Sequence, residues 1–313
     1  LAGLGFMALA ARIDLVKARA LIKPGILLIL ALLGVVFLVR PVAHVHRWIP
    51  LGLINLQPSE FAKIALVLYL ADFFDRCSSQ IAADWRVMFK PLGVMAVMLG
   101  LIALEPDLGT PTLMFVVALM IFFAAGIKLK YLLLPLAAAL PIFILELVRH
   151  PYRWARLTTF LSPFEDTTGK GYQLAQSLLA VGSGGWWGKG LGASKLKLMY
   201  VPEPHTDFIF PIIAEEIGLV GSLFIVLLFV ALLIKGVRIA RNAPDFYTTL
   251  AALGLTLTLA LQAFFNLAMS TGLLPTKGIP LPFFSYGGSS ILATMISVGL
   301  ILNISAHRSR GAG

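Results

Sequence analysis

The chain has 313 residues, of which 59% are hydrophobic and 13% charged, and its formal net charge is +10. A soluble domain is about half apolar and a quarter charged, so this composition excludes an ordinary soluble enzyme and indicates a membrane protein. In so apolar a chain the basic residues set orientation in the membrane, and we expect no nucleic-acid partner. Cys77, the single cysteine, cannot form an intrachain disulfide, and no His/Cys cluster has metal-site spacing.

The sequence begins at Leu1 within an apolar run, with no initiator methionine and no charged segment before it. A secretory signal peptide carries a positively charged segment ahead of its apolar core. We therefore expect no signal peptide and interpret the chain as an N-terminally truncated fragment.

Apolar segments recur along the whole chain, separated by connections that are rich in Pro, Gly or charge. They lie near residues 1–11, 24–39, 61–75, 91–104, 111–127, 131–148, 208–234, 247–273 and 288–305. A helix needs about 20 mostly apolar residues to cross a bilayer core, and lipid offers no partner to backbone groups outside a helix. The pattern predicts an all-α, polytopic integral membrane protein with about nine transmembrane helices, in one membrane domain over residues 1–313.

Basic residues predict on which side of the membrane each connection lies. One set of alternate connections is strongly basic and holds Arg12, Lys17, Arg19, Lys23, Arg76, Arg86, Lys90, Lys128, Lys130, Lys235, Arg238, Arg241, Arg308 and Arg310. The short connections of the other set hold Arg40, Arg47 and Lys277. Because short basic loops stay in the cytoplasm, we expect residues 150–207 to form one large extracytoplasmic loop. Most acidic residues lie on that outer side, where ionisable groups are functional candidates.

The segment RWIPLGLINLQPSEFAK (residues 47–63) leads from a polar turn into an apolar segment. Pro58 and Ser59 are typical of a helix start, and Glu60 near that N-terminus complements the helix dipole. Glu60 and Lys63, three residues apart, share a helix face. They either pair with each other or leave Lys63 for an anionic ligand.

The segment EPDLGT (residues 105–110) is a tight break between two apolar segments. Pro and Gly account for the turn but not for its two carboxylates. Glu105 and Asp107 are therefore either interfacial helix caps or contacts for a substrate, a metal ion or a partner protein.

The expected outer loop carries two further features. Arg153 and Arg156 are three residues apart, so on a helix both guanidinium groups would face one phosphate, pyrophosphate or lipid headgroup. The glycine-rich run GSGGWWGKG (residues 182–190) is not a nucleotide-binding loop, because other residues stand where that motif needs its first Gly and its final Ser or Thr. Its two tryptophans suit the membrane interface.

The loop ends in VPEPHTDFIFPIIAEEIG (residues 201–218), in which Asp207 directly precedes the next apolar segment. Asp207 is either a helix N-cap or, beside His205, a half-desolvated carboxylate that serves as a proton acceptor. Glu215 and Glu216 follow about two turns later, and we expect them to pair with Lys or Arg on a neighbouring helix.

The segment LLPTKGIPLPFFSYGGSS (residues 273–290) bears Lys277 and Ser285 on a Pro- and Gly-rich backbone. Irregular backbone at membrane depth is tolerated only where protein or a water-filled cavity covers it. We expect this segment to form one wall of a cleft.

Taken in order, these motifs resemble those of the SEDS family (shape, elongation, division and sporulation), which includes FtsW, RodA and SpoVE. The resemblance covers nearly the whole chain and rests on RWI with QPSEFAK, EPDLGT, GYQLAQSLLA, GKGLG, HTDFIF with AEEIG, and PTKG with FFSYGGSS. GYQLAQSLLA, LGASKLKL and LLPTKG are closer to the FtsW form than to RodA. Family members have about ten transmembrane helices, so this chain is expected to lack the first and part of the second.

The resemblance implies a peptidoglycan glycosyltransferase that polymerises lipid II into glycan strands on the outer face of the cytoplasmic (inner) membrane, at the division septum. It implies a class B penicillin-binding transpeptidase and other division-machinery membrane proteins as partners. By the motif match, Asp207 corresponds to the acidic residue regarded as catalytic. The residues expected to bind substrate are Arg47, Glu60, Lys63, Glu105, Asp107, Arg153, Arg156, His205, Lys277 and Ser285.

The motifs fix no cofactor. A divalent cation, Mg²⁺ or Mn²⁺, that bridges Asp207 and the pyrophosphate is an arrangement that the sequence leaves open. The chain departs from the family pattern at His44-Val45-His46 and at Pro204 and Pro211, which flank HTDFIF. These departures bear on local loop geometry rather than on the reaction.

Two other functions stay open. A transporter that moves lipid II across the membrane would also use charges such as Lys63, Glu215 and Glu216. Its charges should gather at the midplane, whereas those of a polymerase should gather at the outer surface, where most of the charged motifs are expected. A division scaffold that only recruits partners would tolerate substitution of Asp207 but not truncation of its loops.

Overall fold

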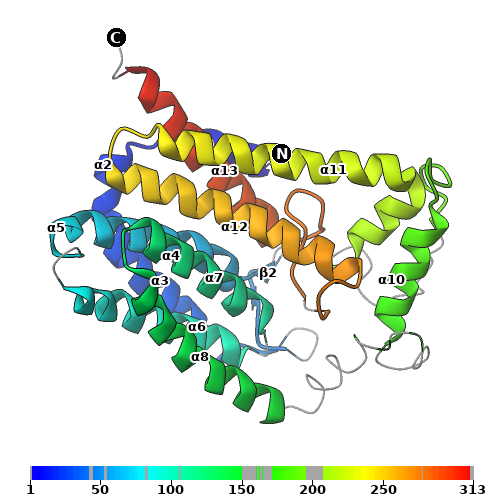
Figure 1. Ribbon diagram of the computed structural model, residues 1–313, viewed down its shortest axis with the longest axis horizontal. Helices are drawn as coiled ribbons and strands as arrows, with labels where there is room; N and C mark the ends of the chain where they lie inside the picture. The colour runs from blue at the N-terminus through cyan, green and yellow to red at the C-terminus, as the bar shows by residue number, and fades with distance from the viewer. Residues whose placement is uncertain are drawn as a thin grey trace. The chain divides into compact units, whose positions relative to one another are not determined.

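The computed structural model describes residues 2–41, 45–52, 55–81, 84–105, 107–149, 160, 162, 164, 171–194, 207–276 and 278–310. This part of the chain is mainly helical, as predicted (Figure 1). Its elements are, in chain order, α1 (Ala2–Ala10), α2 (Leu15–Ala18), η1 (Arg19–Leu21), α3 (Ile22–Val35), β1 (Ile49–Pro50), β2 (Asn55–Leu56), α4 (Pro58–Arg76), α5 (Ser78–Ile81), η2 (Trp85–Met88), α6 (Phe89–Leu104), α7 (Gly109–Ala124), α8 (Leu129–Arg149), α10 (Tyr172–Ser183), α11 (Ile209–Arg241), α12 (Phe246–Ser270) and α13 (Gly288–Arg310).

Every apolar segment predicted from the sequence overlaps one of these helices. Within the described residues, four helical segments are long and apolar enough to cross a membrane, namely Trp85–Leu104, Ile209–Arg241, Phe246–Ser270 and Gly288–Ala306. Gly109–Ala124 and Leu129–Pro141 are apolar but shorter. The chain is therefore an all-α membrane protein, while the count of about nine crossings stays a prediction.

The chain divides into two compact units. Unit 1 comprises Leu1–Pro135, Leu232–Leu261 and Gly288–Gly313, and unit 2 comprises Leu136–Ala231 and Gln262–Gly287. Helices α8, α11 and α12 contribute residues to both units. The division therefore does not follow a boundary along the sequence, and the single membrane domain over residues 1–313 stays a prediction.

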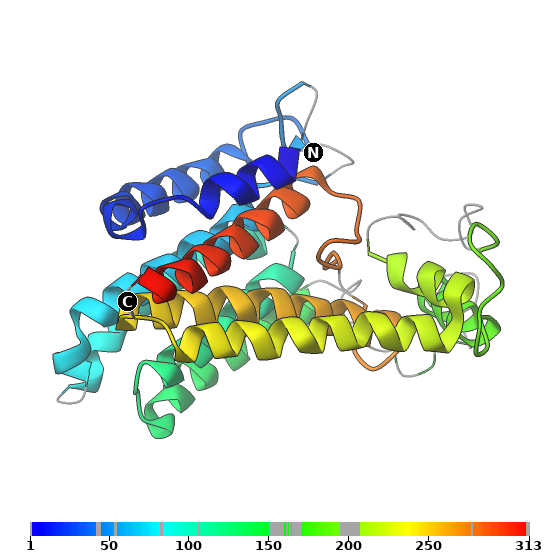
Figure 2. The ribbon, with the colours of Figure 1, turned by 90° about the horizontal axis from the view of Figure 1, so that it is seen from above.

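Helix α4 is the centre of unit 1, where it packs against α3, α6, α7 and α13. Its residues Leu66, Leu70 and Phe74 are almost completely buried, and the ring of Phe74 meets that of Phe122 on α7 edge to face at 5.0 Å. Figure 2 shows α1 beside α13, and the two helices pack along their length. A helix buried on most of its surface needs a partner for any charge it carries, and α4 carries several.

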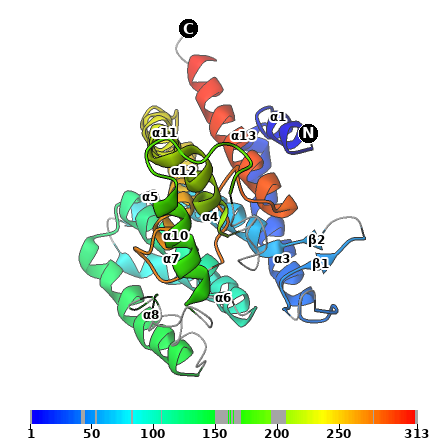
Figure 3. The ribbon, with the colours of Figure 1, turned by 90° about the vertical axis from the view of Figure 1, so that its right-hand side faces the viewer.

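A short hairpin precedes α4 in unit 1. Strand β1 pairs antiparallel with β2, with Ile49 opposite Leu56 (Figure 3). Helix α4 then begins at Pro58, whose missing N–H group costs nothing in the first turn of a helix, after an extended Gln57. The hairpin therefore connects the RWI and QPSE motifs and holds the end of the first close to the start of the second.

Unit 2 contains α10 and the first part of α11, which has a break. Figure 1 shows the first turns of α11 set at an angle to its long remainder, and the break lies at Gly218, where φ is 69° and ψ is −167°. Phe208 lies in one buried cluster with Ala180 of α10, and Phe210 lies in another with Ala263 of α12. These two clusters anchor the turn that precedes α11.

Candidate functional site

The described candidate residues fall in both units. Arg47, Glu60, Lys63, Glu105 and Asp107 belong to unit 1, and Asp207 and Ser285 belong to unit 2. The remaining candidates, Arg153, Arg156, His205 and Lys277, lie outside the described residues.

Glu60 and Lys63 form an ion pair on the first turns of α4. Lys63 Nζ lies 2.9 Å from Glu60 Oε2, and the two side chains are only 6% and 3% exposed. The three-residue spacing predicts either an ion pair with Glu60 or an anionic ligand for Lys63. The structure shows the ion pair. Because two charges removed from water depend on each other for stabilisation, neither can be lost alone without cost.

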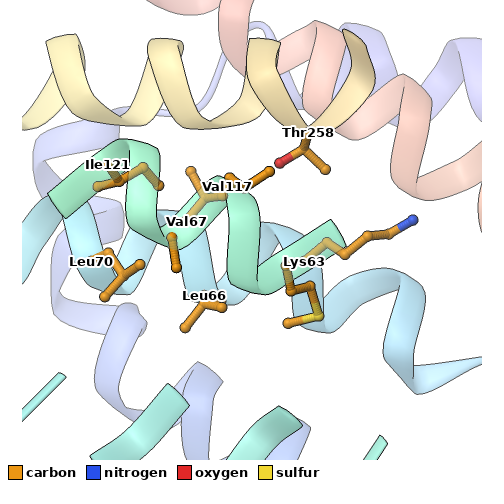
Figure 4. Close-up of a pocket in the computed structure, with 9 residues that line it drawn as sticks. Lys63, Leu66, Val67, Leu70, Val117, Ile121 and Thr258 are labelled. Atoms are coloured by element: carbon orange, nitrogen blue, oxygen red, sulfur yellow. The ribbon is translucent and has the colours of Figure 1, made fainter. Parts of the chain in front are cut away.

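A small pocket lies beside the stem of Lys63 between α4, α7 and α12. It is lined by Leu66, Val67 and Leu70 of α4, by Val117 and Ile121 of α7, and by other residues of unit 1 that include Thr258. Figure 4 shows the Lys63 ammonium pointing away from these apolar side chains. Mainly apolar side chains and the hydrocarbon stem of Lys63 therefore line the pocket, which lacks the several polar groups that a sugar would need.

Two motifs far apart in the sequence meet at the start of α4. Ser289, in the FFSYGGSS motif, accepts a hydrogen bond from Gln57 N at 3.0 Å and donates one to Asn55 O at 3.0 Å. Its hydroxyl therefore joins α13 to the hairpin and to the cap of α4. The sequence motifs do not predict this role of Ser289, because its partners are backbone groups.

Arg47 holds the C-terminal end of α6. Its Nε donates to the backbone carbonyl of Glu105 at 3.0 Å, where a cation also complements the helix dipole. The carboxyl group of Glu105 is fully buried, and neither of its oxygens has a hydrogen-bond partner among the described residues. Burial, and then the charge of Asp107, raise the pKa of Glu105 to about 8 against the opposing effect of Arg47. Glu105 is therefore mainly protonated at neutral pH.

Asp107 caps the first turn of α7. Its Oδ1 accepts hydrogen bonds from Gly109 N at 2.8 Å and Thr110 N at 3.2 Å, and its Oδ2 accepts one from the Thr110 hydroxyl at 2.8 Å. The sequence leaves capping and ligand contact open for this residue, and the structure shows the capping. A contact between Asp107 and a substrate stays a prediction.

Asp207 lies half-buried in the turn that precedes α11. Its backbone carbonyl accepts a hydrogen bond of 2.9 Å from Nδ2 of Asn266 on α12. The buried Phe208 and Phe210 follow it and anchor the turn to the core of unit 2. One hydrogen bond and two buried side chains thus hold the backbone at Asp207.

The segment after α12 is ordered by hydrogen bonds from side chains to backbone. Asn266 Nδ2 also donates to Ile279 O at 2.7 Å, and Gln262 Nε2 donates to Pro280 O at 2.9 Å. The buried Ser285 accepts a hydrogen bond from Leu281 N at 2.7 Å. Ser285 therefore stabilises the turn, and its contact with a substrate stays a prediction.

The glycine-rich turn between α10 and the undescribed part of the loop lies against the break in α11. Lys189 N donates to Glu215 O and Leu219 N donates to Gly185 O, at 3.0 and 2.9 Å. A Cβ atom on Gly218 would collide with the backbone of Gly188 and would lie 2.6 Å from Trp186 O. The glycines of this motif therefore serve close backbone packing.

Glu215 lies in a polar cluster beneath this turn. Its carboxylate accepts a hydrogen bond from Lys189 Nζ at 2.8 Å and from the hydroxyl of Ser194 at 2.7 Å. The sequence predicts a partner on a neighbouring helix, but the structure supplies the partner from the turn. Backbone hydrogen bonds join this turn to α11 on both sides of the break at Gly218, which places Lys189 beside Glu215.

Within the described residues, no three His, Cys, Asp or Glu side chains form a group that could hold a metal ion. Asp207 is the carboxylate that the sequence nominates as a cation ligand. Mg²⁺ commonly binds through one or two carboxylates together with substrate phosphates, so a single protein carboxylate fits that mode.

Comparison with known proteins gives consistent matches over most of the chain. The family model named for FtsW, RodA and SpoVE, described as "Cell cycle protein", matches residues 1–310. Stage V sporulation protein E of Bacillus subtilis is 41% identical over 281 residues, which are 90% of this chain and 76% of that protein. A probable peptidoglycan glycosyltransferase FtsW of Geobacter sulfurreducens is 41% identical over 315 residues, which cover 100% of this chain and 84% of that protein.

Solved structures match as well. A chain from a study of how a peptidoglycan synthase complex coordinates polymerization and crosslinking has a TM-score of 0.83 and 28% identity, and the match covers 98% of this chain and 87% of that one. The crystal structure of the rod shape determining protein RodA of Thermus thermophilus has a TM-score of 0.70 and 28% identity, covering 98% of this chain and 86% of RodA.

Proposed function

The chain belongs to the FtsW/RodA/SpoVE family of cell cycle proteins, and from this premise we propose that it is a peptidoglycan glycosyltransferase that polymerises lipid II. Relatives at about two-fifths identity are named probable peptidoglycan glycosyltransferase FtsW, and a chain of similar structure comes from a study of a peptidoglycan synthase complex. The observation that carries the proposal is the position of Asp207, a half-buried acid in the turn directly before a membrane-spanning helix.

That position suits a lipid-linked substrate. Lipid II has a polyprenyl tail that stays in the bilayer, so its pyrophosphate and disaccharide lie at the membrane surface. The first residue of a spanning helix lies at the same level, and Asp207 precedes Ile209, where α11 begins, by two residues. A carboxylate at this depth is partly shielded from water and can accept a proton from a bound hydroxyl.

In the proposed reaction, the Asp207 carboxylate accepts the proton of the acceptor sugar's 4-hydroxyl. The hydroxyl oxygen forms a bond with the anomeric carbon of the donor, and the bond from that carbon to the pyrophosphate oxygen breaks. Undecaprenyl pyrophosphate leaves with the electron pair of that bond, and the configuration at the anomeric carbon inverts. Asp207 then returns its proton to solvent.

The leaving pyrophosphate gains negative charge, which nearby cations would stabilise. Arg47, Lys63, Arg153, Arg156 and Lys277 are the proposed groups. Of these groups, Lys63 forms a buried ion pair with Glu60, with Nζ 2.9 Å from Oε2. In this proposal Glu60 holds the ammonium in place for the substrate.

A divalent cation would supply further charge neutralisation at the pyrophosphate. Asp207 is the proposed protein ligand, and the remaining ligands would be pyrophosphate oxygens and water. This stays a proposal alongside the role of Asp207 as base.

We further propose that the enzyme works at the division septum in the cytoplasmic membrane, on its outer face, with a class B penicillin-binding transpeptidase as its partner. The basis is the match to FtsW relatives and to a chain of a synthase complex. Strands made by this chain would be crosslinked by that partner.

A lipid II transporter is the second candidate, and the buried Glu60–Lys63 pair of α4 favours it, since ionisable residues buried in a membrane protein mark substrate and ion pathways. The test is to reconstitute the full-length protein with its cognate transpeptidase in liposomes that carry labelled lipid II. Glycan strands from the wild type and none from Asp207→Ala support the polymerase. Movement of lipid II between leaflets without glycan strands would instead support the transporter.

A further inference from the structure

One buried amide on α12 makes hydrogen bonds to two backbone segments that are distant in the sequence. Asn266 is 0% exposed, and its Nδ2 donates to Asp207 O at 2.9 Å and to Ile279 O at 2.7 Å. An amide NH₂ group has two N–H donors, so these two bonds use its full donor capacity. The same side chain therefore ties the turn of Asp207 to the Pro-rich segment after α12.

A second amide continues this arrangement one helical turn earlier. Gln262 and Asn266 are four residues apart and share a face of α12. Gln262 is 1% exposed, and its Nε2 donates to Pro280 O, the carbonyl next to that of Ile279. We call Gln262 and Asn266 the amide clamp.

Packing on the same side of α12 supports the clamp. Ala263 belongs to one cluster of buried side chains with Phe210 of α11 and Leu281 of the segment after α12. Residues 278–281 belong to no helix or strand, so no regular ladder satisfies their carbonyls. The amides replace that ladder and leave the carbonyls of residues 279 and 280 in fixed places.

We propose that Asn266 is a positioning residue for Asp207. Through the amide clamp, the position of the Asp207 backbone depends on the position of the backbone of residues 279–281. This inference rests on the proposed function of Asp207 as the base. Asn266 acts through the backbone carbonyl of Asp207, and the carboxylate keeps its own surroundings.

The clamp should affect the chemical step more than substrate binding. A base displaced by about 1 Å from its hydroxyl loses on the order of 100-fold in rate. The cationic groups proposed to bind the pyrophosphate are other residues, so their contribution to KM should persist. Loss of the Asn266 amide is therefore expected to lower kcat with little change in KM.

The chain offers a matched control for this substitution. Asn303 on α13 is also 0% exposed, and its Nδ2 also donates to two backbone carbonyls, those of Ala10 at 3.1 Å and Ile13 at 2.6 Å. Replacing either asparagine with Leu removes a buried amide that bridges two carbonyls, but only Asn266 holds the turn of Asp207. A general loss of stability should thus be similar in the two variants.

The experiment compares Asn266→Leu, Asn303→Leu and Asp207→Asn with the wild type, in the full-length protein with its transpeptidase partner, using labelled lipid II. We expect Asn266→Leu to lower kcat about 100-fold with KM within about twofold, and Asn303→Leu to retain kcat within about threefold. Thermal unfolding and binding of the partner show that each variant is folded. If Asn266→Leu does not fold, Asn266→Ser, whose short hydroxyl cannot reach both carbonyls, takes its place with the same expected split.

Equal loss of kcat in the Asn266 and Asn303 variants would overturn the inference, and so would a rise in KM at unchanged kcat. Normal polymerisation by Asp207→Asn would overturn the proposed base itself. Loss of activity in Asp207→Asn with full activity in the folded Asn266 variant would overturn the clamp alone.

Discussion

The buried ion pair of α4 gives the sharpest stability prediction. Glu60 and Lys63 have side chains that are 3% and 6% exposed and a charge separation of 2.9 Å. Removing one partner of such a pair leaves an uncompensated buried charge, which costs about 3–5 kcal/mol. We therefore expect Lys63→Met to lower the free energy of unfolding by that amount, and the double variant Glu60→Gln with Lys63→Met to recover most of the loss.

The exposed pair Asp14–Lys17 has the same three-residue spacing and provides the control. The side chain of Asp14 is 51% exposed and that of Lys17 is 86% exposed. Lys17→Met should cost less than about 1 kcal/mol because water already solvates both charges. The assay is unfolding in mixed detergent micelles by titration with a denaturing detergent, followed by circular dichroism. If Lys63→Met cost no more than Lys17→Met, or if the double variant were less stable than the single one, the pair would not be shielded from water.

Two further predictions concern the carboxyl group of Glu105 and the break in α11. The pKa of Glu105 is about 8 in the folded protein against an ordinary value of 4.5, so the folded state holds one more proton between these values, and the wild type should lose stability as the pH rises from about 5 to 8. Glu105→Gln should lose less over the same range, and equal slopes in thermal unfolding would contradict the pKa shift. Gly218→Ala should destabilise the protein by about 2 kcal/mol or more, because its φ of 69° with ψ of −167° is a conformation that essentially only Gly adopts, at a cost to other residues of about 1–3 kcal/mol, and because a Cβ would collide with Gly188. Gly100→Ala on α6, where a Cβ meets nothing within 4 Å, should leave stability equal or slightly higher, and a similar loss in both variants would count against the close packing at Gly218.

The helices were predictable because apolar segments of a membrane protein have one available backbone structure. The segment predicted near 208–234, for example, is α11 at Ile209–Arg241. Its break was not predictable, because a single Gly does not by itself end a helix and no Pro stands next to Gly218. At this break the backbone of residues 185–190, which is distant in the sequence, forms hydrogen bonds with α11.

The candidate site was predictable where charges stand close together in the sequence. The Glu60–Lys63 pair follows from helical spacing, and the cap at Asp107 was one of the alternatives for EPDLGT. Asn266 and Ser289 escaped prediction, because polar residues in apolar helices have no distinctive pattern and their partners are backbone carbonyls or N–H groups. Only the folded chain brings Asp207 and Ile279 to the same amide.

The most direct measurement of the central claim is polymerisation of lipid II by Asp207→Asn, which keeps the size of the side chain but removes its ability to accept the proton. In the full-length protein with its transpeptidase, we expect this variant to bind lipid II within about threefold of the wild-type Kd and to lose at least about 100-fold in polymerisation rate. Asp14→Asn, at an exposed acid, should polymerise normally. A folded Asp207→Asn protein that bound its partner and made glycan strands at the wild-type rate would contradict the account.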